Sequence, residues 1–188
     1  MKIHQLQATY LIEQDRILVR LNTSVGEELR LWLTRRMTKN LFGPMMEAST
    51  ELIAAQIPMA SHDGADHKTL LQFQKQASLQ QADFSTPFES HALVLPIGEE
   101  PLLATAVHIK TGADSALHIG FEENIPGVAT ARSFEITLGA TLLHGFLHLL
   151  ESALRQSGWD LTLGDLDELN QNQLADAFAT AVPPRYLN

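Results

Sequence analysis

The sequence predicts an α+β protein whose antiparallel sheets are built from two strands-then-helix units, a βββα-type pseudo-repeat. Three observations support this fold class. Segments such as "RILVRLN" and "LRLWLT" alternate apolar and polar residues at period two, which is typical of half-buried strands. The segment that follows them has apolar residues at helical spacing. The same order of elements then returns in the second half, although the residue identity between the two halves is low.

The first unit covers residues 1–57. Strands are expected over residues 5–12, 16–22 and 29–34, and "TRRMTKNLFGPMMEASTELIAAQ" is expected to form a helix. Gly43-Pro44 inside this segment predicts a kink or a break into two helices, because proline lacks the N–H that an interior helical position donates.

The second unit covers residues 92–158 and follows a connector, residues 58–91, that includes a glutamine-rich helix candidate. Four segments are expected to be strands: "HALVLPI", "LLATAVHIKT", "SALHIGFEE" and "SFEITL". A strongly amphipathic helix should follow and end at Gly158. Residues 159–188 form an acidic tail with one more expected helix, about residues 165–181. The units are expected to form one compact domain or two small packed ones.

The first hairpin predicts a candidate binding face. If Leu21 lies opposite Leu29 on the core face, the loop is "TSVGE" and Gly26 is free to take a positive φ. The opposite face then carries three cross-strand pairs: Leu18 with Trp32, Arg20 with Arg30, and Arg16 with Thr34. Opposed like charges destabilise a sheet, so we expect an acidic group between the arginines. Arg16, Arg20, Arg30 and Trp32 are the predicted binding residues, and replacing Arg20 and Arg30 with Glu should leave folding largely intact.

Histidines offer two candidate metal-binding groups. A three-residue loop "GAD" would place Ile109 opposite Leu117 and make His108 and His118 cross-strand neighbours. On the last helix of the second unit, His144, His148 and Glu151 are expected on the polar side. The strand pair has only two ligands, and the helix has two with Glu151 as a possible third, whereas a typical site has three or four, so no metal and no other cofactor is expected.

Composition narrows the classes of function. The chain has 188 residues, no cysteine and a net charge of −9, and residues 1–57 carry seven Lys and Arg against six Asp and Glu. The remaining residues carry six Lys and Arg against sixteen Asp and Glu. The resulting negative charge disfavours nucleic-acid and anionic membrane partners. No leader and no long apolar run is present, so a cytoplasmic location is expected. The chain also lacks the G-x-S-x-G, P-loop and G-x-G-x-x-G motifs.

These observations favour a non-catalytic binding or assembly protein that acts through protein–protein contacts, with a homodimer as the favoured form. In that dimer the basic face of the first unit would meet the acidic tail. One alternative is a single-stranded nucleic-acid binder, since the order of elements is similar in outline to the Whirly and PUR-type folds. That resemblance concerns element order only. A second alternative is a small metal-dependent enzyme that uses histidine and carboxylate ligands.

Overall fold

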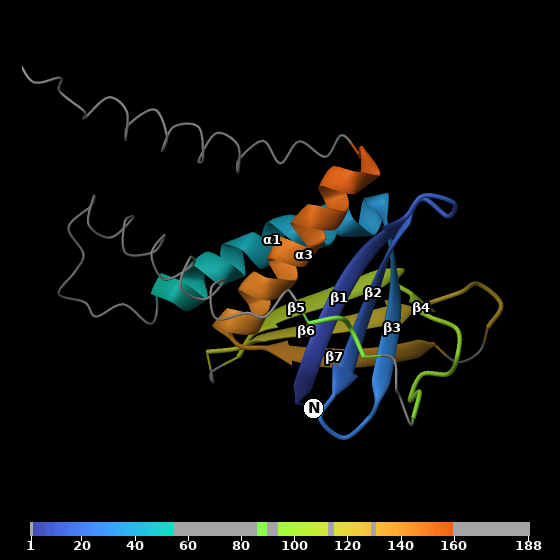
Figure 1. The fold of residues 1–188 in the computed structure, drawn as a ribbon, viewed down its shortest axis with the longest axis horizontal. Helices are drawn as coiled ribbons and strands as arrows, with labels where there is room; N and C mark the ends of the chain where they lie inside the picture. Colours follow the sequence, from blue (N-terminus) through green and yellow to red (C-terminus); the bar gives the residue numbers. More distant parts are fainter. Residues whose placement is uncertain (1, 55–85, 90–93, 113–114, 129–130, 160–188) are drawn as a thin grey trace, which may run out of the picture. The chain divides into compact units, whose positions relative to one another are not determined.

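The computed structural model describes residues 2–54, 86–89, 94–112, 115–128 and 131–159. These residues form two sheets and two helices, which confirms the α+β class (Figure 1). The described residues up to Gly158 belong to one compact unit. The helix candidate of the connector and the helix expected over residues 165–181 lie outside the described residues. In the described part of the chain, no helix is both long and apolar enough to cross a membrane.

Sheet 1 has the strand order β1-β2-β3-β4. Its strands are β1 (Ile3–Leu11), β2 (Arg16–Thr23), β3 (Glu28–Thr34) and the two-residue β4 (Leu102–Leu103). The predicted register of the β2–β3 hairpin is confirmed, because Leu21 lies opposite Leu29 and Arg20 opposite Arg30. Gly26 in the connecting loop has a φ of 83°, a conformation that glycine adopts without strain.

Sheet 2 has the strand order β5-β6-β7, with β5 (Ala106–Thr111), β6 (Leu117–Glu123) and β7 (Arg132–Leu138) all antiparallel. The register predicted for β5 and β6 is wrong by two residues: Ile109 lies opposite Ile119, not Leu117. The connecting loop is longer than three residues and closes through a hydrogen bond from Gly112 N to Ala116 O (2.8 Å). A shift of two preserves the face of each side chain and changes only its partner.

The segment expected as one strand over residues 102–111 is divided between the two sheets. β4 pairs in parallel with β3, whereas β5 pairs with β6. Ala104 N still donates to Trp32 O, and Thr105 N donates to Glu122 O, so the crossing takes place at these two residues. The strand expected over "HALVLPI" is not present in residues 94–97, where Val94 forms only an isolated parallel bridge with Glu27.

Two helices contact each other and both sheets: α1 (Arg35–Ala54) and α3 (Ala140–Ser157). Of the kink or break expected at Gly43-Pro44, the break into two helices does not occur, since α1 continues through Pro44. Buried Leu41 and Met45 anchor the helix on both sides of the proline, so packing offsets the missing hydrogen bond. α3 ends as predicted at Gly158, which takes the left-handed conformation of a helix C-cap.

The core is formed by one face of each sheet together with the apolar sides of the helices. Its largest fully buried side chains come from all three parts: Ile17, Leu21, Leu31, Leu33 and Leu102 from sheet 1, Leu117, Ile119, Phe121 and Ile136 from sheet 2, and Leu41, Met45 and Phe146 from the helices. The opposite face of β1–β3 points away from this core, and it carries the predicted binding residues.

Candidate functional site

The face of β1–β3 that points away from the core is called the outer face here. It carries alternate residues of the three strands: Gln5, Gln7, Thr9 and Leu11 from β1, Arg16, Leu18, Arg20 and Asn22 from β2, and Glu28, Arg30, Trp32 and Thr34 from β3. All four predicted binding residues lie on it. Arg20 and Arg30 are direct cross-strand neighbours, and Trp32 follows Arg30 on the same face. Arg16 is four residues from Arg20 along β2, about 13 Å away, and is not part of their cluster.

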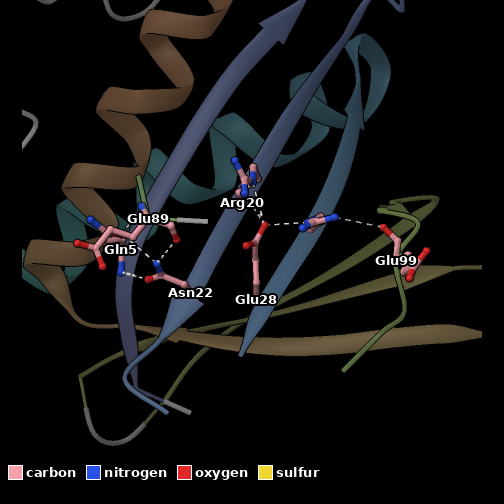
Figure 2. Close-up of polar contacts among 7 residues, drawn as sticks. Gln5, Arg20, Asn22, Glu28, Glu89 and Glu99 are labelled. Carbon is pink, nitrogen blue, oxygen red and sulfur yellow. Dashed lines mark hydrogen bonds and ion pairs between the residues drawn. The ribbon is translucent and has the colours of Figure 1, made fainter. Parts of the chain in front are cut away.

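A buried carboxylate lies between the two arginines, as the sequence predicts without naming the residue. Glu28 Oε1 accepts hydrogen bonds from Arg20 Nε (2.9 Å) and Arg30 Nε (2.8 Å), and Arg20 Nη2 lies 2.8 Å from the same oxygen. The Glu28 side chain is 0% exposed, whereas Arg20 and Arg30 are 20% and 30% exposed. Figure 2 shows the Glu28 carboxylate beside Arg20. We call Arg20, Glu28 and Arg30 the ion triad.

The charge state of Glu28 follows from this geometry. Burial alone raises the pKa of the Glu28 carboxyl, but hydrogen bonds from Arg30 and Arg20 and their positive charges lower it, and the net pKa lies below its usual value. Glu28 is therefore ionised at neutral pH. Its second oxygen, Oε2, is buried and has no hydrogen-bond partner among the described residues. Both arginines thus bind the same oxygen, Oε1.

The ion triad changes the interpretation of the predicted site. Arg20 and Arg30 compensate a buried negative charge, so they are structural parts of the sheet and not an open cationic patch. Reversing both charges would place two more carboxylates against Glu28. The expectation that the double replacement leaves folding intact is therefore at odds with the contacts of Glu28.

Two side-chain amides on the outer face bind a main chain. Gln5 and Asn22 lie opposite each other on β1 and β2, and Asn22 Nδ2 donates to Gln5 Oε1 (2.9 Å). Gln5 Oε1 also accepts from Glu89 N (3.0 Å), and Asn22 Nδ2 donates to Glu89 O (3.2 Å). Gln5 Nε2 donates to Pro87 O (3.2 Å). We call Gln5 and Asn22 the amide clamp and residues 86–89 the strap; Figure 2 shows Glu89 beside the clamp.

The strap also contacts the ion triad. The Phe88 ring lies over the Arg20 guanidinium, 4.4 Å from Arg20 Cζ to the ring centroid, which is the geometry of a cation–π contact. Phe88 is half-buried, while Thr86, Pro87 and Glu89 are exposed. The strap is thus held at the surface by polar and cation–π contacts. Sequence reasoning missed it because the segment carries no strand or helix pattern, and its partners Gln5 and Asn22 are 82 and 67 residues away in the chain.

A cavity of about 320 Å³ lies next to the clamp, at the hairpin end of sheet 1. Its lining residues come from three parts of the chain: His4, Asn22, Thr23, Ser24, Gly26, Glu27 and Glu89. His4 is the extra residue where the β1–β2 register shifts between Ile3 and Gln5, and such a bulge redirects a side chain. The cavity therefore borders both Asn22 of the clamp and Glu89 of the strap.

A second buried carboxylate fixes the segment that leads into β4. Arg132 of β7 forms an ion pair with Glu123, whose side chain is 6% exposed, and Leu103 N donates to Glu123 Oε1 (3.1 Å). Arg132 Nη1 also donates to Ile97 O (3.3 Å) and Glu100 O (3.0 Å). From sheet 1, Arg30 Nη1 donates to Glu99 O (3.5 Å). Arginines of both sheets therefore hold this segment in place.

The histidines of sheet 2 are not the neighbours that the sequence predicts. His108 lies opposite Gly120 and His118 opposite Lys110, and each histidine is near a different carboxylate. His108 Nε2 is 3.4 Å from Glu122 Oε1, and His118 Nδ1 is 3.3 Å from Glu135 Oε1. Across the described ranges, no three His, Asp or Glu side chains are arranged to hold a metal ion.

His144 is not on a polar surface as predicted, but is buried between the helices. His144 Nε2 and Ser49 Oγ of α1 are 2.7 Å apart, and the two residues are 2% and 5% exposed. His148 is exposed, and Glu151 forms a pair with Arg155 at 3.0 Å. The prediction fails because α1 covers the side of α3 that holds His144. A serine–histidine contact at this distance resembles an activated nucleophile, but burial between two helices makes it a packing contact.

We compared the chain with models of known protein families, with curated proteins and with solved structures, and none of them matches.

Proposed function

We propose that this chain is a non-catalytic binding and assembly protein that acts in the cytoplasm through protein–protein contacts, with the outer face of sheet 1 as its contact surface. A second copy of the chain is the partner that we favour. The single observation that carries the proposal is the amide clamp. Gln5 and Asn22 hold both the N–H and the C=O of Glu89, so the surface has the chemistry for binding polypeptide main chain.

The composition of the outer face also supports a protein contact. Leu18 and Trp32 are cross-strand neighbours and half-exposed, and the ion triad holds Arg20 and Arg30 in fixed positions beside them. Tryptophan and arginine are enriched among residues that dominate protein–protein binding. Side chains that are already held in place lose less conformational entropy when a partner binds.

The same geometry favours a protein over a nucleic acid as the partner. Glu28 binds to both arginines, so few positive charges on this face remain for phosphate groups. A single-strand binder of this outline would present basic and aromatic side chains across the sheet. Here the side chains outside the ion triad are uncharged except for Arg16, and they are amides, threonines, two leucines and Trp32.

The experiment is sedimentation velocity over a wide concentration range, at low and high salt, for the parent and for Trp32→Ala. A dimer through the outer face should weaken by about tenfold or more in Trp32→Ala, the effect of removing a central interface residue. Ile125→Ala is the matched control, because Ile125 is an apolar residue that is 47% exposed on the loop after β6. A parent that stays monomeric at every concentration, or a dimer that Trp32→Ala leaves unchanged, would contradict the proposal.

A further inference from the structure

The strap is held by side-chain hydrogen bonds to its main chain and by one cation–π contact. Three hydrogen bonds from the amide clamp reach its main-chain atoms at Pro87 O, Glu89 N and Glu89 O. Its one half-buried side chain, Phe88, lies on the Arg20 guanidinium and not in the apolar core. Contacts of this type bury little apolar surface, so local detachment of the strap requires little free energy compared with unfolding the sheet.

We propose that two copies of this chain exchange their straps, so that residues 86–89 of one copy occupy the amide clamp of the other. This inference rests on the proposed function, because it assumes that the outer faces of two copies meet. It adds a specific occupant and a reciprocal mechanism. The second copy's strap has the same atoms as the one in place, so each clamp contact and the Phe88–Arg20 contact are formed equally well between copies.

The chain length on the C-terminal side of the strap permits the exchange. Val94 is anchored to the hairpin loop, because Val94 N donates to Gly26 O (3.3 Å) and Val94 O accepts from Glu28 N (3.0 Å). Five residue steps separate Glu89 from Val94, a reach of at most about 17 Å for an extended chain. Sheets that pack face to face are about 10 Å apart. A strap that stays tethered at Val94 can therefore reach a clamp on a facing sheet whose offset within the sheet plane is no more than about 14 Å.

The chain length on the N-terminal side does not oppose it. Residues 55–85 join α1 to the strap, and 31 residues can extend over about 100 Å. The entropic cost of closing such a long connection changes only slowly with its length. Exchange of an identical element between two copies is also a known low-cost route to dimers.

The test uses two complementary variants of the full chain. The strap-deficient variant carries Phe88→Ala and Glu89→Pro; proline lacks the N–H that Gln5 Oε1 accepts. The clamp-deficient variant carries Gln5→Ala, which removes the acceptor for Glu89 N and the donor for Pro87 O. Glu89→Gln is the matched control, because it keeps the main-chain N–H. Circular dichroism and thermal melting verify that each variant is folded.

Each variant is labelled with a donor or an acceptor fluorophore, and energy transfer is measured for each variant alone and for the mixture. We expect each variant alone to dimerise at least about tenfold more weakly than the parent, because contacts at the centre of the interface are lost. The mixture should form a heterodimer that neither variant forms with itself, since one intact strap then meets one intact clamp. Glu89→Gln should dimerise like the parent.

The outcomes separate this inference from the proposed function. If the parent dimerises and Trp32→Ala weakens the dimer, but the mixture shows no preference for the heterodimer, the exchange is wrong and the assembly proposal stands. If both strap and clamp variants dimerise like the parent, the exchange is also wrong. If the parent is monomeric at every concentration, both proposals fall.

Discussion

Replacing Glu28 with Gln should destabilise the protein strongly, although the two side chains have nearly the same shape. The amide oxygen of the introduced glutamine can still accept hydrogen bonds, but Arg20 and Arg30 lose the negative charge between them. Hydrogen bonds to charged groups exceed neutral ones by about 1 to 1.5 kcal/mol each. Two arginine partners therefore lose about 2 to 3 kcal/mol, and the repulsion of opposed like charges adds up to about 1 kcal/mol. Both arginines are partly hydrated, at 20% and 30% exposure, and water offsets part of this loss. We therefore expect the free energy of unfolding to fall by about 3 kcal/mol in total.

The assay is thermal and urea unfolding of Glu28→Gln and of the control Glu27→Gln. A loss of about 3 kcal/mol corresponds to a fall in Tm of roughly 6 to 12 °C for a domain of this size. Glu27 is half-exposed and its carboxylate is 3.5 Å from Thr23 Oγ1, so its replacement should change the free energy of unfolding by less than about 0.5 kcal/mol. Equal stability of Glu28→Gln and the parent would refute the structural role of the ion triad.

Three further predictions concern pH and helix packing. The pKa of Glu28 is lowered in the folded protein, so its stabilising effect is present above the ordinary Glu value of about 4.3 and is lost as the pH falls through the folded-state pKa. The difference in the free energy of unfolding between the parent and Glu28→Gln should therefore shrink in acid, as measured by urea unfolding at a series of pH values. A constant difference throughout the acid range would contradict this. Ser49→Ala removes the buried partner of His144 Nε2 and should lower the free energy of unfolding by about 1 to 3 kcal/mol. Thr50→Ala, on the exposed side of α1, should lower it by less than about 0.5 kcal/mol. Equal effects of the two replacements in thermal melts would refute the burial argument. Pro44→Ala should raise the free energy of unfolding by about 1 to 3 kcal/mol, because it restores a helical hydrogen bond at an exposed position. A lower Tm than that of the parent would contradict the account of α1.

The sequence predicts the first hairpin well because two physical signals agree there. Alternation assigns the face of each residue, and the glycine-containing loop "TSVGE" sets the register, so Arg20 is opposite Arg30 as expected. In the second hairpin the alternation is equally clear, but Ser115, and not a glycine, takes a positive φ of 55° in the loop, so Gly112 in "GAD" does not set the register. The faces of Ile109 and Ile119 are therefore correct, while the partners of His108 and His118 are not.

The rest of the candidate site depends on tertiary contacts that no local pattern encodes. Opposed arginines indicate that an acidic group is near, but several carboxylates in the sequence could satisfy that requirement, and only the folded structure identifies Glu28. The hydrogen bond between Gln5 of the clamp and Pro87 of the strap joins residues that are 82 positions apart in the chain. His144 is misassigned for the same reason, because helical periodicity describes one helix and not the neighbour that covers it.

The dimer itself can be tested with labels at unique sites, because the chain has no cysteine. Thr9→Cys places a spin label on the outer face of sheet 1, and Ser133→Cys places one on an exposed position of sheet 2. Pulsed electron paramagnetic resonance then measures the distance between the two spin labels of a dimer. The outer-face account predicts a defined distance for Thr9→Cys that is shorter than the one for Ser133→Cys. A shorter distance for Ser133→Cys, or no dipolar coupling at either site, would contradict it.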